Sequence, residues 1–270
     1  MMKQFKLTIA LCLGIILLSS CEKVIDIDLN NAEKKYVVEA TISEEAGTAR
    51  VRITQTVNFD ESNYTPGING ATVTISDNLG NIYDFTDNNS GTYSHGTLVA
   101  VPGRTYTLNV QVNSETFTAV CKMPEPVDID SLFITDELLF GEYQKTVNVL
   151  FQDPPGRGNA YRFHQVVNGL KEMRIMIMND DYSDGRLISS TLFYFVDEDA
   201  GNVALKSGDE VEVTLQAIDA PVYKYWFSLD RSASGGNQQA APSNPVSNIR
   251  GGALGYFSAH AERTKTIVVP

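Results

Sequence analysis

The sequence predicts a mainly β protein made of two consecutive antiparallel β-sandwiches, with one short helix near the C-terminus. Apolar and polar residues alternate with period two over most of the chain after residue 24, which is the pattern of strands with one buried face. Turn-forming Gly, Pro, Asn and Asp recur at the spacing of about 8–12 residues that is typical of sandwiches. Only residues 221–232 have the apolar spacing of an amphipathic helix.

Residues 1–20 have the layout of a lipoprotein signal peptide. Lys3 and Lys6 precede an apolar block at 7–18, which is shorter than the roughly 20 residues that a membrane-spanning helix needs. The block ends in Leu18-Ser-Ser-Cys21, which resembles a bacterial lipobox. In signals of that kind the chain is cut before the cysteine, whose thiol carries a diacylglycerol, so we expect a lipid anchor on Cys21. The alternative is an ordinary secretory signal in which Cys21 follows the block by coincidence.

The charge of the chain argues against a nucleic-acid partner, and its cysteines argue against a disulfide. The chain has 21 basic and 33 acidic residues, and removal of Lys3 and Lys6 with the signal leaves 19 basic residues and a net charge of −14. Nucleic acid is therefore excluded as a partner, because its binding depends on neutralising phosphates with Lys and Arg. A lipidated Cys21 cannot pair with Cys121, so no disulfide is expected. Cys121 lies on one strand face with Phe117 and Ala119, which favours a buried thiol over a reactive one.

The first sandwich is expected over residues 21–123, directly after the anchor. Ile25, Ile27 and Leu29 alternate with polar residues, so a strand should begin near Val24 and only about three residues would separate the lipid from the fold, a reach of roughly 10 Å. Further strands are expected at 36–42, 50–56, 71–77, 82–86, 106–112 and 116–121. Turn sequences at 77–80, 87–91 and 102–103 separate them.

The prolines of Met123-Pro-Glu-Pro126 interrupt the strand pattern and mark a domain boundary. The second sandwich is expected over 124–270, with strands at 131–134, 146–151, 161–167, 173–178, 187–196, 210–218 and 264–269. Asp219 is a suitable N-cap and Pro221 a suitable first-turn residue for a helix over 221–232. Its aromatic stripe, which includes Trp226, indicates core packing, with a ligand box as the alternative. A long Gly/Asn/Pro-rich loop is expected at 233–255.

Several sequence motifs resemble those of known protein families. Residues 70–75, 91–93 and 102–108 resemble the prealbumin-like or immunoglobulin-like sandwiches of exported bacterial proteins, which implies a fold and no activity. Residues 21–29, 37–40, 70–73 and 244–257 together resemble a family of Bacteroidota lipoproteins of unknown function. Such proteins are often encoded beside TonB-dependent outer-membrane transporters. The resemblance implies an outer-membrane accessory role, offers no catalytic residues, and leaves the cell-surface and periplasmic faces both open.

The sequence contains no clear metal centre. The three histidines, His95, His164 and His260, stand on separate segments without a partner three or four residues away, so we expect no metal site there. Residues 180–185 imitate the start of a calcium loop, but Tyr182 and Thr191 stand at positions three and twelve, where acidic ligands are usual. The acidic loop 197–202 is also incomplete. Both are expected to be hairpin turns, and weak calcium binding stays open as the alternative.

No motif of an enzyme is found, and neither a catalytic residue nor a cofactor is expected. The chain lacks Gly-x-Ser-x-Gly, a phosphate-binding loop and a dinucleotide fingerprint. We therefore expect a non-enzymatic, lipid-anchored outer-membrane accessory protein that acts through protein contacts, including contacts with a TonB-dependent transporter in nutrient uptake. The alternative is a surface glycan- or peptide-binding module, for which Tyr64, Tyr182 and Tyr256 are candidate stacking residues in loops. A lipid-anchored hydrolase is the minor alternative.

Overall fold

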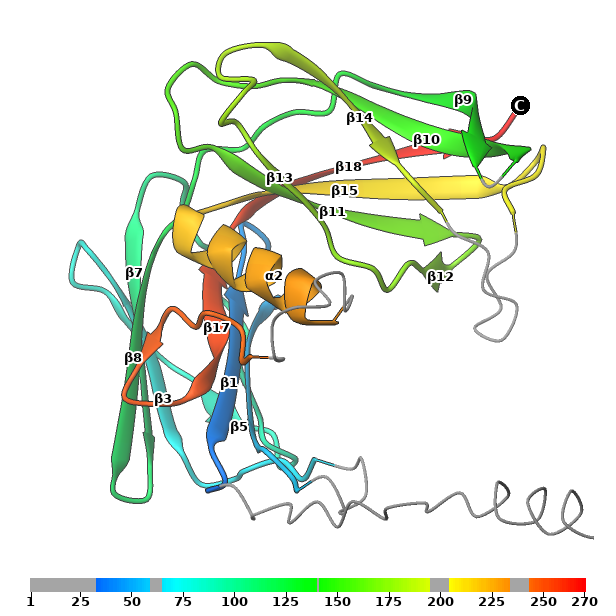
Figure 1. The fold of residues 1–270 in the computed structure, drawn as a ribbon. Helices are drawn as coiled ribbons and strands as arrows, with labels where there is room; N and C mark the ends of the chain where they lie inside the picture. The colour runs from blue at the N-terminus through cyan, green and yellow to red at the C-terminus, as the bar shows by residue number, and fades with distance from the viewer. Residues whose placement is uncertain (1–32, 59–64, 140, 195–203, 234–242) are drawn as a thin grey trace, which may run out of the picture. The chain divides into compact units, whose positions relative to one another are not determined.

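The computed structural model describes residues 33–58, 65–139, 141–194, 204–233 and 243–270. The chain divides into two units, Met1–Glu33 with Asn58–Asp60, and Lys34–Val57 with Glu61–Pro270. Of the first unit only Glu33 and Asn58 are described, so the signal peptide, Cys21 and the strand expected after Val24 lie outside the described residues. Every element named below belongs to the second unit. Figure 1 shows how the chain runs through these elements. None of its described helices is long and apolar enough to cross a membrane.

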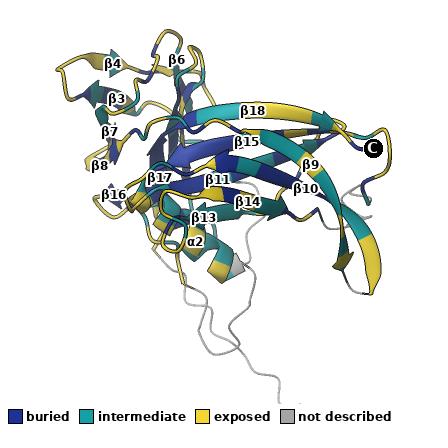
Figure 2. Cartoon of the chain, turned by 90° about the horizontal axis from the view of Figure 1, so that it is seen from above, coloured by how far each residue is buried: buried dark blue, intermediate teal, exposed yellow. Residues whose placement is uncertain are grey.

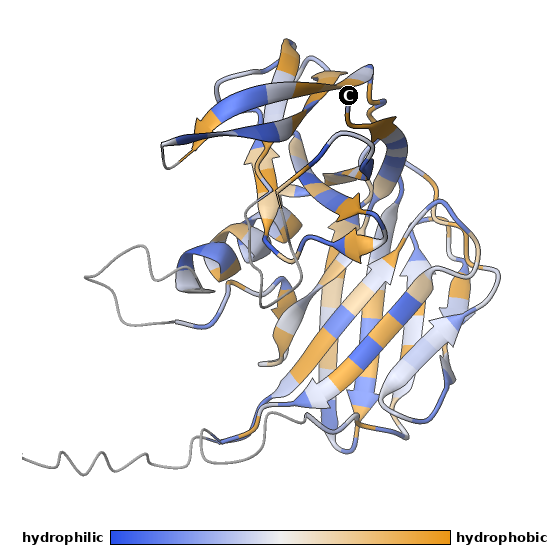
Figure 3. Ribbon diagram, turned by 90° about the vertical axis from the view of Figure 1, so that its right-hand side faces the viewer, coloured by the Kyte–Doolittle hydropathy of each residue, from blue (hydrophilic) through white to orange (hydrophobic). Residues whose placement is uncertain are grey.

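The first sandwich packs two five-stranded sheets against each other. One has the order β17-β1-β2-β6-β5 and the other the order β16-β8-β7-β3-β4. Their bounds are β1 Tyr36–Ile42, β2 Ala49–Gln55, β3 Thr72–Asp77, β4 Ile82–Asp84, β5 Thr86–Asp87, β6 Thr92–His95, β7 Thr105–Val112, β8 Glu115–Lys122, β16 Ile249–Arg250 and β17 Leu254–Ala259. Alternate residues such as Val38, Ile53, Leu108 and Phe117 fill the core between the sheets. Figure 3 shows hydrophobic and hydrophilic residues alternating along the strands, as the period-two pattern predicts.

The second sandwich packs the three-stranded sheet β14-β10-β9 against a sheet of order β12-β11-β15-β18, in which β13 also pairs with β11. The bounds are β9 Ser131–Leu139, β10 Glu142–Gln152, β11 Ala160–Val167, β12 Leu170–Lys171, β13 Met176–Asn179, β14 Leu187–Leu192, β15 Glu210–Ile218 and β18 Ala261–Val268. Val149, Phe151, Tyr161, Phe163 and Leu215 contribute to its core. Burial is deepest along β11 and β15 (Figure 2).

The expected helix is confirmed as α2, Ala220–Ala233, which contacts β11, β13 and β17. Its N-terminus is capped by Asp219, whose Oδ1 accepts a hydrogen bond of 3.0 Å from the backbone N–H of Val222. The buried face of the helix includes Val222 and Tyr225. The mainly β, antiparallel sandwich character of the fold is also confirmed.

The C-terminal part of the chain corrects the expected domain division. β17 pairs in parallel with β1, from Val37 opposite Leu254 to Ile42 opposite Ala259, and β16 pairs with β8. Residues expected as part of the loop 233–255, or of an independent sandwich over 124–270, therefore join the sheets of the first sandwich. The close pairing requires glycine at position 255, where φ is +98° and an added Cβ would lie 2.0 Å from the carbonyl oxygen of Val38.

The chain then passes directly from the first sandwich into the second. His260 follows β17, and its backbone N–H donates to the carbonyl oxygen of Ile42 at 3.1 Å. β18 begins at the next residue and pairs with β15. This passage brings the ends of β17 and β18 beside helix α2 and the outer face of β11 and β15, where the candidate site lies.

Candidate functional site

Three polar residues form a row across the second sandwich. In the strand register Arg162 of β11 lies opposite Gln216 of β15, and Gln216 lies opposite Glu262 of β18. Their sequence neighbours Tyr161, Phe163 and Leu215 point into the sandwich core. Because side chains alternate between the faces of a sheet, the row projects from the opposite face. Neighbouring strands are about 4.8 Å apart, so the backbones of Arg162 and Glu262 are separated by roughly 10 Å.

A cleft of about 330 Å³ opens over this row. Its lining comes from β1 and the turn after it, from β11, β12, β15 and α2, and from β17, β18 and the residue between them. The lining residues are Thr41, Ile42, Ser43, Thr48, Arg162, His164, Lys171, Gln216, Ile218, Trp226, Tyr256, Ser258, His260 and Glu262. Most of these side chains are polar or aromatic. The cleft is therefore a place where polar groups from both sandwiches converge, as ligand-binding sites require.

Arg162 lies at one end of the row against aromatic side chains. Its guanidinium carbon is 3.5 Å from the ring centroid of Trp226, and the hydroxyl of Tyr256 also interacts with the guanidinium. The Trp226 and Tyr256 rings meet edge to face at 5.0 Å. Burial lowers the pKa of Arg162. No carboxylate of the described residues forms an ion pair with this guanidinium.

Glu262 lies at the other end of the row and is held by a polar network. The Gln216 amide nitrogen donates to Glu262 Oε2 at 3.1 Å, and His260 Nε2 lies 3.6 Å from the same oxygen. The His260 contact and the Gln216 hydrogen bond together lower the pKa of Glu262 to about 2, so this carboxylate is ionised at neutral pH. Its Oε1 accepts no hydrogen bond from the described residues.

His164 sits beside Arg162 on the same strand face, and its ring is neutral. His164 Nε2 donates a hydrogen bond to the side-chain amide oxygen Oε1 of Gln216 at 3.2 Å. Burial and the positive charges of Arg162 and Lys171 lower the pKa of His164 to about 3. The cleft thus has a cationic end at Arg162 and Lys171, a neutral centre at His164 and Gln216, and an anionic end at Glu262.

Ser258 and His260 give this cleft a partial likeness to a nucleophile and its base. Ser258 Oγ lies 3.1 Å from His260 Nδ1, while the opposite ring nitrogen faces Glu262. A nucleophile must reach its substrate, yet Ser258 is only 3% exposed. The same hydrogen bonds hold His260 and Glu262 in fixed orientations, so the arrangement favours binding over acyl transfer.

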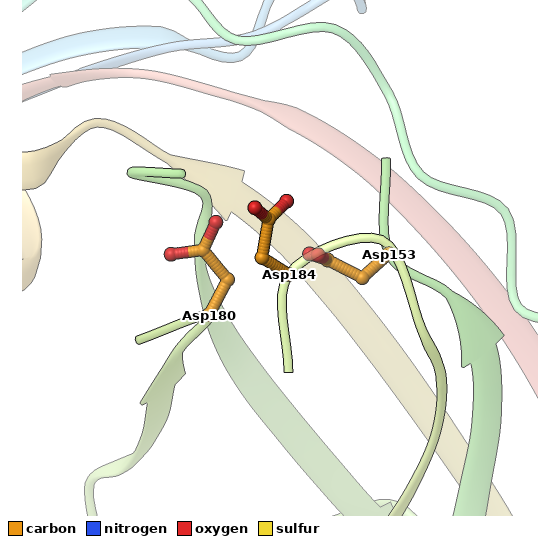
Figure 4. A group of neighbouring side chains, drawn as sticks. All are labelled: Asp153, Asp180 and Asp184. Carbon is orange, nitrogen blue, oxygen red and sulfur yellow. The ribbon is translucent and has the colours of Figure 1, made fainter. Parts of the chain in front are cut away.

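A second cluster joins the carboxylates of Asp153, Asp180 and Asp184, whose oxygens lie within 4.8 Å of one another (Figure 4). Asp180 and Asp184 belong to the loop that imitates a calcium site, and Asp153 was not expected there. The backbone N–H of Gly158 donates to both Asp180 oxygens at 3.0 and 2.9 Å, and that of Gly156 donates to Asp184 at 2.7 Å.

Asp153 accepts hydrogen bonds too, from the backbone N–H of Gly185 at 2.9 Å and from the hydroxyl of Tyr161. Together these hydrogen bonds join the chain at 153–158 to the loop at 180–185, so the acidic cluster ties two loops of the second sandwich together. The other acidic loop, 197–202, lies outside the described residues.

The histidines and tyrosines that were predicted as site candidates lie in different parts of the structure. His164 and His260, which stand on distant segments of the sequence, meet in the cleft through Gln216. The ring of His95 packs against Tyr83, and its Nδ1 accepts a hydrogen bond from the backbone N–H of Leu98. Tyr182 is exposed and lies away from the cleft. Tyr256 lies on β17 and not in a loop. Tyr64 lies outside the described residues.

Cys121 is fully buried, as expected, and burial raises the pKa of its thiol well above the usual value. Arg162, Gln216 and Glu262 were not among the residues predicted from the sequence, because their convergence depends on the register of three distant strands. One signal was available: Arg162 and His164 are polar residues on one face of a strand whose other face is mostly apolar, with Gln165 as its one polar residue.

Comparison with known proteins gives a family and no activity. The model of a family described as a domain of unknown function, DUF4249, matches residues 22–266. No curated protein matches the chain. Among solved structures, the chain is similar to a two fibronectin type-III domain segment from chicken tenascin, with 12% identity, a TM-score of 0.22, and coverage of 70% of this chain and 93% of that one. It is also similar to the Yersinia pseudotuberculosis adhesin InvE, with 16% identity, a TM-score of 0.20, and coverage of 68% and 55%.

Proposed function

Because the chain belongs to the DUF4249 family, a domain of unknown function, we propose from its own geometry that it is a non-enzymatic protein that binds a small polar ligand. The convergence of Arg162, His164, Gln216 and Glu262 on one cleft supports this proposal most directly. Hydrogen bonds from Gln216 to His164 and Glu262 fix three of these side chains before a ligand arrives, which reduces the entropy lost on binding.

The proposed setting is the outer membrane, with a lipid on Cys21 as the anchor. The lipobox-like sequence and the short distance from Cys21 to the expected first strand support this setting. In this proposal the protein hands its ligand to a TonB-dependent transporter at the same membrane. Pull-down of the lipidated protein from detergent-solubilised outer membrane tests the partnership. Recovery of the protein alone, under conditions that keep other membrane complexes intact, would count against it.

Ligand binding has a built-in reporter, because Trp226 is the only tryptophan of the chain and lines the cleft. We expect the emission of Trp226 and the melting temperature of the protein to change when the right ligand is added. The panel should contain free amino acids, short peptides and neutral oligosaccharides. If no member changes either signal at millimolar concentration, the cleft does not act as a binding site of this kind and the proposal fails.

A further inference from the structure

The two ends of the cleft carry opposite charges. At the Arg162 end the guanidinium is half-buried against Trp226 and Tyr256, and the described residues supply no carboxylate to pair with it. Lys171 adds a second positive charge near it. A buried guanidinium without an anion is costly, and a planar carboxylate is the group that matches its donors best.

The Glu262 end carries a negative charge and has an oxygen that is open to a ligand. One carboxylate oxygen is engaged by Gln216 and faces His260, while the other accepts nothing from the described residues. The Glu262 side chain is 34% exposed, so a ligand can reach it. The group that best complements an ionised carboxylate with a free oxygen is a primary ammonium, which has three donors.

The register sets the distance between these two ends. Arg162 and Glu262 flank Gln216 on adjacent strands, so their backbones are roughly 10 Å apart. An extended peptide advances about 3.3–3.6 Å per residue, so about three residues span that distance. The amide groups of such a peptide would meet His164 and Gln216, which line the cleft between the two ends and offer both donors and acceptors.

We infer that the ligand is a short zwitterionic peptide of about three residues, with its terminal carboxylate on Arg162 and its terminal ammonium on Glu262. This inference rests on the proposed function of the cleft and adds the chemical class of its ligand. Trp226 and Tyr256 keep the guanidinium in place, and Lys171 strengthens the field that attracts the carboxylate. The oppositely charged ends also fix the direction of the peptide in the cleft.

The test uses three forms of one peptide with the full lipidated chain in detergent. The probes are Gly-Ala-Ala with both termini free, the same peptide acetylated at its N-terminus, and the same peptide amidated at its C-terminus. Binding is followed by Trp226 emission and by calorimetry. We expect each blocked form to bind roughly 10- to 100-fold more weakly than the free form, because each loses one charge-assisted contact.

Two variants test which residue binds which terminus of the peptide. Arg162→Gln should abolish the preference for a free carboxylate and keep the preference for a free amine, whereas Glu262→Gln should do the reverse. Arg186→Gln changes an exposed arginine directly before β14, outside the lining of the cleft, and should leave all three affinities unchanged. Circular dichroism and melting temperature show that each variant is folded, and the three peptide forms test the idea on the unaltered protein in any case.

The possible results separate this inference from the proposal on which it rests. Equal binding of the three peptide forms would overturn the zwitterion assignment. Binding of a neutral oligosaccharide without binding of the peptide would also overturn it, but would leave the cleft as a ligand site. Failure of every probe to alter Trp226 emission or the melting temperature would overturn both.

Discussion

Replacement of Gly255 by alanine should destabilise the protein far more than an ordinary glycine substitution. Gly255 lies on β17 with φ at +98°, and an added Cβ would meet the oxygen, carbon and nitrogen of Val38 at 2.0, 2.7 and 3.0 Å. These are backbone atoms of β1 and cannot rotate away. The strand β17 must therefore move away from β1, with which it is paired over six residues.

Gly252 supplies the matched control. Its φ is +95°, but an added Cβ would meet nothing within 4 Å. Both substitutions carry the strain of a left-handed backbone, which costs roughly 1–3 kcal/mol. Gly255→Ala also loses two or three strand hydrogen bonds, at about 0.5–1.5 kcal/mol each, so its free energy of unfolding should fall by roughly 1–4 kcal/mol more than that of Gly252→Ala.

Urea unfolding followed by Trp226 emission measures both variants, since the only tryptophan reports on the region between the sandwiches. Equal losses in the two variants would refute the reasoning, because they would show that the contact with Val38 adds nothing to the backbone strain.

Three further predictions concern single residues around the cleft. The pKa of His164 is lowered to about 3, so the folded protein binds fewer protons than the unfolded chain between pH 6.5 and 3. The free energy of unfolding should therefore fall as the pH is lowered through this window. In a plot of the urea midpoint against pH, His164→Gln should flatten this part of the curve. The buried thiol of Cys121 should resist iodoacetamide in the folded protein and react after denaturation, as mass spectrometry would show; rapid labelling of the native protein would contradict its burial. Asp219→Ala removes the N-cap of α2 and should cost about 1 kcal/mol in thermal unfolding, whereas Asp219→Asn keeps an acceptor and should cost much less; equal costs would argue against a capping role.

Local chemistry was enough to predict most elements of the fold. The alternation of Val147, Val149 and Phe151 follows from one buried strand face, and the capped helix follows from Asp219 and the spacing of Val222 and Tyr225. These signals depend only on neighbours along the chain. They were sufficient to locate the helix and most of the strands of both sandwiches.

Pairing between distant strands could not be read in the same way. Gly251, Gly252 and Gly255 look like loop residues, but Gly255 is required by the close approach of β17 to β1, more than 200 residues earlier in the chain. The row of Arg162, Gln216 and Glu262 likewise exists only once the register of β11, β15 and β18 is known. Each residue alone is an ordinary polar side chain on a strand.

The cleft depends on this same distant pairing, which allows stability and binding to be separated. Tyr256 and Ser258 are carried by β17, and His260 is tied to β1 through its backbone N–H. Displacing β17 in Gly255→Ala should therefore weaken peptide binding and stability together. Arg162→Gln removes a charge without moving a strand, so it should weaken binding while the fold is kept. If Gly255→Ala bound the free peptide as tightly as the unaltered protein, the cleft would have to be built by β11, β15 and β18 alone, and the contribution of β17 to the site would be excluded.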